Sequence, residues 1–191
     1  MGTQVVLITG ALSGIGRVAA IAFARDGARV VVSGRREREG KALEAELAGL
    51  GAEAFFVRVD VRHDEDVAAL LEATVARFGQ VDAAVNNAGT EGQPGPVVQQ
   101  TAESYAATFE TNVLGTLLCM KHELRVMQAR GRGSIIINIS STYGHRGAAA
   151  LPSMRPASMP SKASPNPRPW NPPRQASGST LWCRARPTPA C

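Results

Sequence analysis

The sequence predicts an α/β fold in which a doubly wound sheet of parallel strands carries helices on both faces. Short β-branched runs alternate with stretches whose apolar residues recur at three-to-four spacing, and the runs are continuously apolar, as in strands buried on both faces. Such alternation gives parallel strands joined by right-handed crossovers. With 191 residues the chain forms one domain but not a complete eight-fold α/β barrel, which takes about 250 residues.

The expected elements follow one another in regular order over residues 1–150. The strands are expected at Val5–Thr9, Arg29–Ser33, Ala54–Val59, Ala83–Asn86 and Ile135–Ile139. The helices are expected at Gly14–Asp26, Arg38–Ala48, Glu65–Phe78 and Glu103–Arg130. Glycines that favour a helix end follow these helices, at Gly27, Gly49, Gly51, Gly79, Gly131 and Gly133.

The last part of the chain differs in composition from the rest. Residues 1–150 carry 15 basic and 16 acidic side chains, whereas residues 151–191 carry six basic side chains and no acidic one. Ten of the twelve prolines also lie after residue 150, where Ile, Val and Phe are absent, so the net charge of +5 comes from this tail. We expect residues 1–150 to form the folded domain and residues 151–191 a disordered, Pro- and Arg-rich tail without strands or helices.

Nothing in the sequence indicates a membrane or an oxidising compartment. No charged leader precedes the short apolar run near the N-terminus, and no apolar stretch approaches the roughly 20 residues that cross a bilayer. Cys119, Cys183 and Cys191 have no metal-ligand spacing and do not form a disulfide framework. We expect a cytoplasmic protein with no metal site and no membrane contact.

A glycine-rich turn joins the first expected strand to the first expected helix. It reads Thr9-Gly10-Ala11-Leu12-Ser13-Gly14-Ile15-Gly16. Glycines let the backbone approach a pyrophosphate closely, and the helix N-terminus offers unpaired N–H groups and the positive end of the helix dipole. In this strand–turn–helix context the turn predicts nucleotide binding, and a plain tight turn is the alternative.

Four further short motifs follow this turn in order. They are Asp60-Val61, Asn86-Asn87-Ala88-Gly89, Asn112-Val113-Leu114-Gly115 and Ile137-Asn138-Ile139-Ser140-Ser141. Together with the turn, they make the chain resemble the short-chain dehydrogenase/reductase family. The resemblance implies a Rossmann-like sheet, here incomplete at its C-terminal side, that binds NAD(H) or NADP(H). It also implies hydride transfer that interconverts the alcohol and carbonyl groups of a small-molecule substrate.

The resemblance assigns these motifs to parts of the cofactor. The residues implied to contact its phosphates and the adjoining ribose are Gly10, Ser13, Gly14, Ile15 and Gly16. Those implied to contact the adenine are Asp60 and Val61, and those implied to line the nicotinamide-side ribose are Ala88 and Gly89. Asn86 and Asn87 either tie the strand ends together or contribute to the cofactor site, and the sequence leaves both roles open.

Charge at the end of the second expected strand indicates which cofactor is preferred. An acidic side chain there accepts hydrogen bonds from the ribose hydroxyls of NAD(H) and repels the 2′-phosphate of NADP(H), which an arginine binds. This chain has Gly34, Arg35 and Arg36 at that place. We expect a preference for NADP(H), with NAD(H) possible and Arg35 as the phosphate clamp. The alternative is that both arginines are solvated loop charges.

The catalytic set of the family is matched only in part. The resemblance assigns Asn112 to the support of a proton relay and Ser141 to positioning of the substrate oxygen. The Tyr and Lys that the family places four residues apart would fall on Met154 and Ser158, and no Tyr-x-x-x-Lys occurs in the chain. Reduction of a carbonyl needs a proton donor, which in this family is a tyrosine whose pKa a nearby cation lowers. We therefore expect the chain as written to be inactive.

A second reading frame of the tail restores the absent motif. If each codon takes the last base of one residue and the first two of the next, Ser153–Asn171 can spell Y-A-A-S-K-H-A-V-E-G-L-T-K-S-A-A-L-E. That string holds Tyr-x-x-x-Lys at the expected place. We therefore expect residues 151–191 to be out of frame, with the departure between Ala148 and Pro152. The strand Ile135–Ile139 would then form an apolar edge of the sheet.

Three functions remain compatible with these motifs. The first is an NADP-dependent oxidoreductase, inactive as written, and the second is a non-catalytic NADP-binding fragment or regulator. The third is a protein that binds nucleic acid or another acidic partner through its basic tail. It ranks last because the basic residues are neither clustered nor interleaved with aromatic ones, so we expect no nucleic-acid partner. The resemblance also implies a homo-oligomer built on the long helices, part of whose contact surface this chain would lack.

Overall fold

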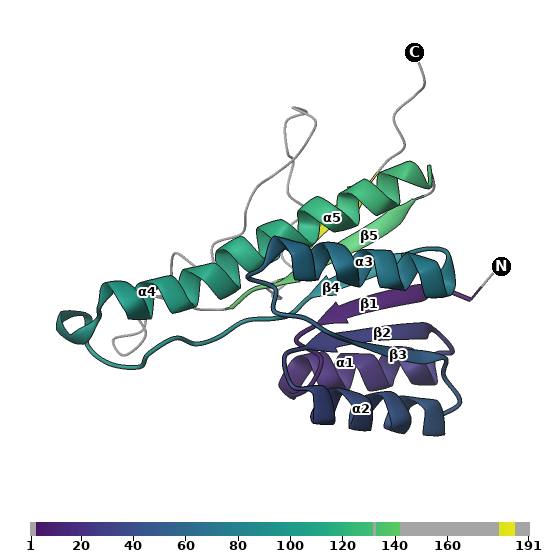
Figure 1. The fold of residues 1–191 in the computed structure, drawn as a ribbon, viewed down its shortest axis with the longest axis horizontal. Coiled ribbons are helices and arrows are strands. Elements are labelled where there is room, and N and C mark those ends of the chain that lie inside the picture. Colours follow the sequence, from purple (N-terminus) through teal and green to yellow (C-terminus); the bar gives the residue numbers. More distant parts are fainter. Residues whose placement is uncertain (1–2, 132, 142–179, 186–191) are drawn as a thin grey trace, which may run out of the picture.

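A computed structural model of the protein describes residues 3–131, 133–141 and 180–185. At its centre lies a six-stranded sheet with the order β3-β2-β1-β4-β5-β6. Figure 1 labels the strands from β3 to β5. Its parallel strands are β1 (Val5–Thr9), β2 (Arg29–Gly34), β3 (Ala54–Arg58), β4 (Ala83–Asn86) and β5 (Ser134–Ile139). β6 (Thr180–Ala185) pairs with β5 in the antiparallel direction. Because β1 pairs with both β2 and β4, the strand order reverses at β1.

Helices cover both faces of this sheet (Figure 1). One face carries α1 (Gly14–Arg25) and α2 (Glu37–Gly49), and the other carries α3 (Asp64–Phe78) and α5 (Gly115–Ala129). The short η1 (Val97–Gln99) and α4 (Ala102–Phe109) extend beyond the sheet, and η2 (Glu110–Leu114) joins α4 to α5. Within the described part of the chain, we find no helix that combines the length and the apolar character needed to span a membrane.

Two apolar clusters hold these layers together, one on each face of the sheet. Successive side chains of a strand point to opposite faces. Val5 and Leu7 accordingly pack with α3 and α5, whereas Val6 and Ile8 pack with α1 and α2. All four side chains are buried, so β1 is covered on both faces, as its continuous apolar sequence predicts.

The doubly wound fold predicted from the sequence is confirmed, and β1 and β4 have the predicted bounds. The long helix expected over Glu103–Arg130 differs, because a π-helical turn, η2, interrupts it. The hydroxyls of Thr111 and Thr116 donate to the carbonyl oxygens of Ala107, at 3.1 Å, and Asn112, at 2.9 Å. These side-chain bonds help to satisfy carbonyls around the wider turn, which apolar periodicity does not reveal.

The expectation that no strand forms after residue 150 is wrong at β6. This strand pairs with β5 from Ser134 opposite Ala185 to Ile139 opposite Thr180. An unpaired β5 would leave a row of backbone N–H and C=O groups without hydrogen bonds. β6 contains Thr180 and Trp182, residue types that favour a strand. β6 and not β5 is therefore the outer strand. The remainder of the expected tail lies outside the described residues.

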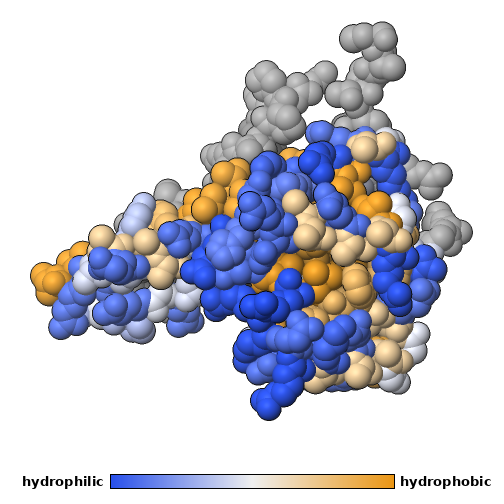
Figure 2. Space-filling view, in the orientation of Figure 1, coloured by the Kyte–Doolittle hydropathy of each residue, from blue (hydrophilic) through white to orange (hydrophobic). Residues whose placement is uncertain are grey.

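The arm formed by η1, α4 and η2 exposes apolar side chains. Figure 2 shows hydrophobic surface at the outer end of this arm and along its upper edge. The exposed large apolar residues from η1 to the first turn of α5 are Val97, Val98, Tyr105, Val113, Leu114 and Leu117. Clustered exposed apolar side chains of this kind are typical of contact surfaces.

Two glycines of α2 provide a matched test of its packing. A Cβ at Gly40 would overlap the ring of Phe56, whereas a Cβ at Gly49 would meet nothing within 4 Å. We expect Gly40→Ala to lower the free energy of unfolding by about 1–3 kcal/mol, as overpacking does. Gly49→Ala should be neutral or stabilise by less than about 1 kcal/mol, because alanine favours the helix. Urea unfolding of both variants measures the difference, and equal effects would contradict the packing of α2 on Phe56.

Candidate functional site

The predicted site residues gather at the carboxyl edge of the parallel strands. The glycine-rich turn follows β1, Arg35 and Arg36 follow β2, and Asp60 and Val61 follow β3. Residues 87–89 follow β4, and Ser141 follows β5. In open α/β sheets a ligand crevice forms at this edge, where the strand order reverses. The fold therefore brings the predicted residues to the place where such a sheet binds ligands.

Thr9 and Asn87 tie the ends of β1 and β4 together. The buried Thr9 hydroxyl accepts hydrogen bonds from the backbone N–H groups of Asn87, at 3.1 Å, and Ala88, at 3.2 Å. In return, the Asn87 amide donates to the carbonyl oxygens of Thr9, at 3.2 Å, and Gly10, at 3.0 Å. Asn87 thus has the strand-tying role that the sequence left open.

Glycine is required where this turn meets the end of β4. Gly10 has φ +62°, and a Cβ there would lie 2.7 Å from the Cα atom of Ala88. A Cβ at Gly16 would overlap the Asn87 amide nitrogen and lie 2.6 Å from the Gly10 carbonyl oxygen. Gly14 differs, because its φ is +54° while a Cβ there would meet nothing within 4 Å. The turn is therefore packed against β4 on one side and open at Gly14.

The N-terminus of α1 lies at this open part of the turn. Ser13 is the N-cap residue, yet its side chain makes no capping hydrogen bond, and the first turn holds no acidic residue. Ser13, Gly14 and Ile15 are exposed. The first backbone N–H groups of α1 have no partner within the helix and carry the positive end of its dipole. This arrangement fits a phosphate group.

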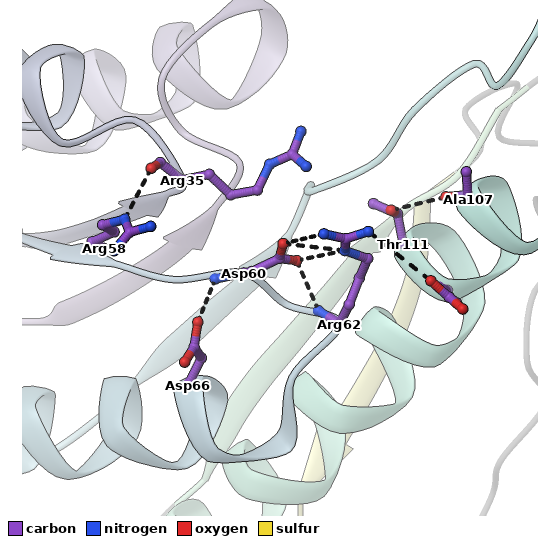
Figure 3. Close-up of polar contacts among 8 residues, drawn as sticks. Arg35, Arg58, Asp60, Arg62, Asp66, Ala107 and Thr111 are labelled. Atoms are coloured by element: carbon purple, nitrogen blue, oxygen red, sulfur yellow. Dashed lines mark hydrogen bonds and ion pairs between the residues drawn. The ribbon is translucent and has the colours of Figure 1, made fainter.

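The ends of β2 and β3 add basic side chains beside the turn. A Cβ at Gly34 would lie 2.7 Å from Leu12 Cδ1, so a side chain at that place would require the Leu12 side chain to move. Arg36 pairs with Glu39 at 3.6 Å, whereas Arg35 enters no ion pair with any described residue. Arg58, which lies opposite Gly34 in the sheet, donates from Nε to the carbonyl oxygen of Arg35 at 3.2 Å (Figure 3).

Asp60 forms a bidentate ion pair with Arg62 (Figure 3). Arg62 donates from Nε to Asp60 Oδ1 at 2.9 Å and from Nη2 to Asp60 Oδ2 at 2.6 Å. The backbone N–H of Asp60 donates to Asp66 Oδ2 at 2.9 Å, which fixes the turn after β3. The hydrogen bonds from Arg62 lower the pKa of Asp60 to about 2, so the Asp60 carboxylate is ionised at neutral pH.

Asn112, in the π-helical turn η2, holds the chain that leaves β4. Its Nδ2 donates to the carbonyl oxygen of Thr90 at 2.8 Å, and its Oδ1 accepts from the backbone N–H of Thr90 at 2.8 Å. A Cβ at Gly89 would lie 3.3 Å from Asn112 Oδ1. The structure thus brings Asn112 and Gly89 together, and the interrupted helix aims the Asn112 amide at the Gly89–Thr90 segment.

The comparison with known families agrees with this geometry. The profile of the family described as short chain dehydrogenase matches residues 4–153. The chain belongs to the short chain dehydrogenase family.

Two curated relatives show how much of a short chain dehydrogenase the chain covers. It is 45% identical over 141 residues to "L-fucose dehydrogenase" of Oryctolagus cuniculus, a match that spans 74% of this chain and 48% of the relative. It is 42% identical over 141 residues to "A-factor type gamma-butyrolactone 1'-reductase (1S-forming)" of Streptomyces virginiae, covering 74% of this chain and 55% of the relative. The chain thus spans about half the length of the curated relatives it matches.

Solved short chain dehydrogenase structures have the same fold. A short chain dehydrogenase/reductase from Burkholderia phymatum in complex with NAD superposes with a TM-score of 0.79 at 29% identity, covering 82% of this chain and 55% of that chain. A variant actinorhodin polyketide ketoreductase with NADPH superposes with a TM-score of 0.77 at 35% identity, covering 82% of this chain and 60% of that chain. Structures of this fold thus include one with each nicotinamide cofactor.

Other residues that the family resemblance singles out have varied surroundings. Val61 is only 7% exposed and packs in the core against Gly115, where a Cβ would lie 2.7 Å from Val61 Cγ2. Its contact with adenine stays a prediction. Ser141 is partly buried just beyond β5. Met154 and Ser158 lie outside the described residues.

Two site residues escaped the sequence analysis. Arg58 gives no signal by itself, because only the strand register places it beside Arg35. Glu123 is fully buried and accepts a hydrogen bond from Asn86 Nδ2 at 3.0 Å. Its signal is its spacing, since it lies four residues after Cys119 and four before Met127, on the buried face of α5.

Replacing Arg62 tests the pair with Asp60. The low pKa of folded Asp60 contributes stability that is present above its ordinary value of 3.8 and is lost as the pH falls toward about 2. Solvent screens this partly exposed pair, so we expect Arg62→Gln to lower the free energy of unfolding at neutral pH by about 1 kcal/mol. NMR titration should show the Asp60 pKa rising toward its ordinary value. Arg36→Gln is the control and should leave that pKa unchanged, and an unchanged pKa in Arg62→Gln would contradict the pair.

Proposed function

We propose that the chain binds NADP(H), with NAD(H) the second possibility, at the carboxyl edge of its sheet. In a chain that carries the tyrosine–lysine proton donor, which the chain as written lacks, this domain would interconvert alcohol and carbonyl groups of a small-molecule substrate. The observation that carries the proposal is the turn after β1, which combines an uncapped helix N-terminus with an exposed left-handed Gly14. Arg35, which follows β2, enters no ion pair with a described residue. When bound, the nicotinamide supplies or accepts the hydride.

The described residues divide the binding of this cofactor among them. Ser13, Gly14 and Ile15 would hold its phosphates through the N-terminus of α1. The ionised Asp60 would accept a hydrogen bond at the adenine end. Ala88 and Gly89 would line the nicotinamide-side ribose, at a position that the Thr9–Asn87 tie and the Asn112 amide fix from two sides.

Arg35 would clamp the 2′-phosphate of NADP(H). Arg36 is already paired with Glu39, which leaves Arg35 as the guanidinium at the end of β2 without an ion pair among described residues. Arg58 holds the carbonyl oxygen of Arg35 and so fixes the backbone from which that side chain extends (Figure 3). A bound phosphate and a guanidinium form charge-assisted hydrogen bonds, which are stronger than neutral ones.

At the substrate end, Ser141 would position the substrate oxygen, and Asn112 would support proton transfer besides holding Thr90. The sequence holds no Tyr-x-x-x-Lys, so the chain as written has no tyrosine–lysine proton donor of the kind the family uses. This favours a second candidate function, in which the chain binds NADP(H) without turning over a substrate.

We also propose that residues 151–191 are read out of frame. The family profile ends its match at residue 153, where the alternative string from Ser153 begins with Tyr-Ala-Ala-Ser-Lys. Methionine and tryptophan have single codons, so Met154, Met159 and Trp170 constrain which letters that string can contain. The domain of residues 1–150 would then continue, in the other frame, into a helix that carries the proton donor.

Cofactor preference is tested by substituting the two arginines after β2. We expect Arg35→Ala to weaken NADPH binding by roughly 10- to 100-fold, the loss of one charge-assisted phosphate contact, and to leave NADH binding nearly unchanged. Arg36→Ala is the matched control and should change neither. Fluorescence titration of the unsubstituted chain and both variants gives the six dissociation constants. Tighter binding of NADH than of NADPH by the unsubstituted chain would overturn the preference.

Restoring the frame tests the proposal about the tail. A gene whose frame is shifted between the codons of Ala148 and Pro152 should encode a protein that oxidises NADPH in the presence of a carbonyl compound. The 191-residue chain should bind NADPH without oxidising it. Tyr→Phe at the restored tyrosine should abolish the activity, because it removes the proton donor and keeps the ring. Turnover by the unshifted chain, or none by the shifted one over a broad carbonyl panel, would contradict the proposal.

A further inference from the structure

A buried polar cluster lies behind the candidate site, where α5 meets the carboxyl ends of β4 and β5. Asn86 Nδ2 donates one hydrogen bond to Glu123 Oε2 at 3.0 Å and another to Asn138 Oδ1 at 2.9 Å. Asn138 Nδ2 in turn contacts Met120 Sδ at 3.3 Å. The cluster joins α5 to the two neighbouring strands through four side chains.

Two oxygens of this cluster have no hydrogen-bond partner among the residues that the structure describes. They are Asn86 Oδ1 and Glu123 Oε1, and both are buried. Both belong to residues that are already bonded to each other through their other polar atoms. Amide and ionised carboxylate oxygens only accept hydrogen bonds, so neither oxygen can satisfy the other while Glu123 is charged. Turning the Asn86 amide over would not help, because its oxygen would then face two acceptors.

The surroundings do not compensate a charge on Glu123. It is fully buried, and it enters no ion pair within the described part of the chain. From its own helix the titratable group that faces it is the buried thiol of Cys119, whose pKa burial and Glu123 raise well above the usual range. From β4 and β5 it faces the neutral Asn86 and Asn138.

Charged groups on the facing helices are engaged elsewhere. Asp64 of α3 pairs with Lys121 at 2.8 Å and with His122 at 2.8 Å, and Glu72 of α3 lies 4.0 Å from Arg125. A buried carboxylate with one neutral hydrogen bond and no cation is strongly disfavoured, and such a group takes up a proton instead.

We propose that Glu123 is a neutral carboxylic acid whose Oε1–H donates to Asn86 Oδ1, which closes a two-bonded acid–amide pair. A single proton then satisfies both orphaned oxygens and leaves the bond from Asn86 Nδ2 to Glu123 Oε2 in place. The pair holds α5 against the end of β4 at Asn86, one residue before Asn87. Through Asn138, three residues before Ser141, it also holds the end of β5. Glu123 is thus a positioning residue for the edge of the sheet that carries the site.

The pair makes the fold sensitive to pH. Burial raises the pKa of Glu123 to about 7 from an ordinary value of 4.5. The folded protein therefore binds this proton more tightly than the unfolded chain does. Its stabilising effect is complete below about pH 4.5 and is lost as the pH rises through about 7. Above that pH Glu123 carries a buried negative charge, and Asn86 Oδ1 and Glu123 Oε1 again lack a proton between them. The ends of β4 and β5 then loosen.

A carboxyl titration tests the proton directly. In the full chain labelled with ¹³C at the glutamate carboxyls, the signal absent from Glu123→Gln belongs to Glu123. We expect its midpoint near pH 7. A midpoint near the ordinary 4.5 would overturn the proposal. This measurement uses the unsubstituted protein for its result and decides the matter even if the variant folds poorly, since Glu123→Asp provides a second route to the assignment.

Stability against pH provides the second test. Glutamine at position 123 can donate to Asn86 Oδ1 and accept from Asn86 Nδ2 without a proton, so it mimics the acid. Between about pH 5 and about pH 8 the unfolding constant of the unsubstituted chain should rise roughly 100-fold more than that of Glu123→Gln. The control Glu91→Gln, at an exposed loop position, should follow the unsubstituted chain. Parallel curves for the chain and Glu123→Gln would overturn the pair.

The effect on the site itself rests on the proposed function. If the chain binds NADPH, its affinity should fall above pH 7 more steeply than that of Glu123→Gln. An absence of NADPH binding in both proteins at every pH would count against the proposed function. The carboxyl midpoint would still decide whether Glu123 holds its proton.

Discussion

The hydrogen bonds between Thr9 and Asn87 are the constraint on which the candidate site depends. They join β1 to β4 at the point where the strand order reverses, and they satisfy backbone groups of both strand ends within the protein. Buried backbone groups left without partners would cost about 1–3 kcal/mol each, so the two ends are held in one arrangement. Gly10 and Gly16 have no room for a side chain because of this closeness.

The candidate site differs in its side chains on the two sides of these hydrogen bonds, toward β3 and toward α5. Toward β3, charged side chains dominate. Arg62 donates hydrogen bonds to Asp60, and Arg58 donates one to the backbone carbonyl oxygen of Arg35. Toward α5, amides and a buried acid dominate. Asn112 is hydrogen-bonded to Thr90, and Glu123 is hydrogen-bonded to Asn86. The first half suits a charged, solvated part of a ligand. In the second half Asn86 and Glu123 are buried, whereas Thr90 is exposed.

The sequence predicted what repeats along the chain and missed what depends on contacts between distant segments. The parallel strands and α1, α2 and α3 follow from apolar runs and helical spacing, and glycine positions follow from turn chemistry. The π-helical turn around Asn112 depends on threonine bonds to the preceding turn, which no periodicity encodes. The Arg58 contact depends on strand register. β6 depends on the open edge of β5, and its pairing overrode the irregular composition of the tail.

The charge balance of the chain bears on which cofactor the proposed site would bind. Residues 1–150 are nearly neutral, so an anion is drawn to the sheet edge by local groups and not by the field of the whole domain. At that edge the Asp60 carboxylate is neutralised by Arg62, whereas Arg35 has no ion-pair partner among the described residues. The local charge at the ends of β2 and β3 is therefore positive, although the acidic Asp60 lies there. A free Asp60 would repel a second phosphate, and its pairing removes that repulsion, which favours NADP(H) over NAD(H) in the proposed site.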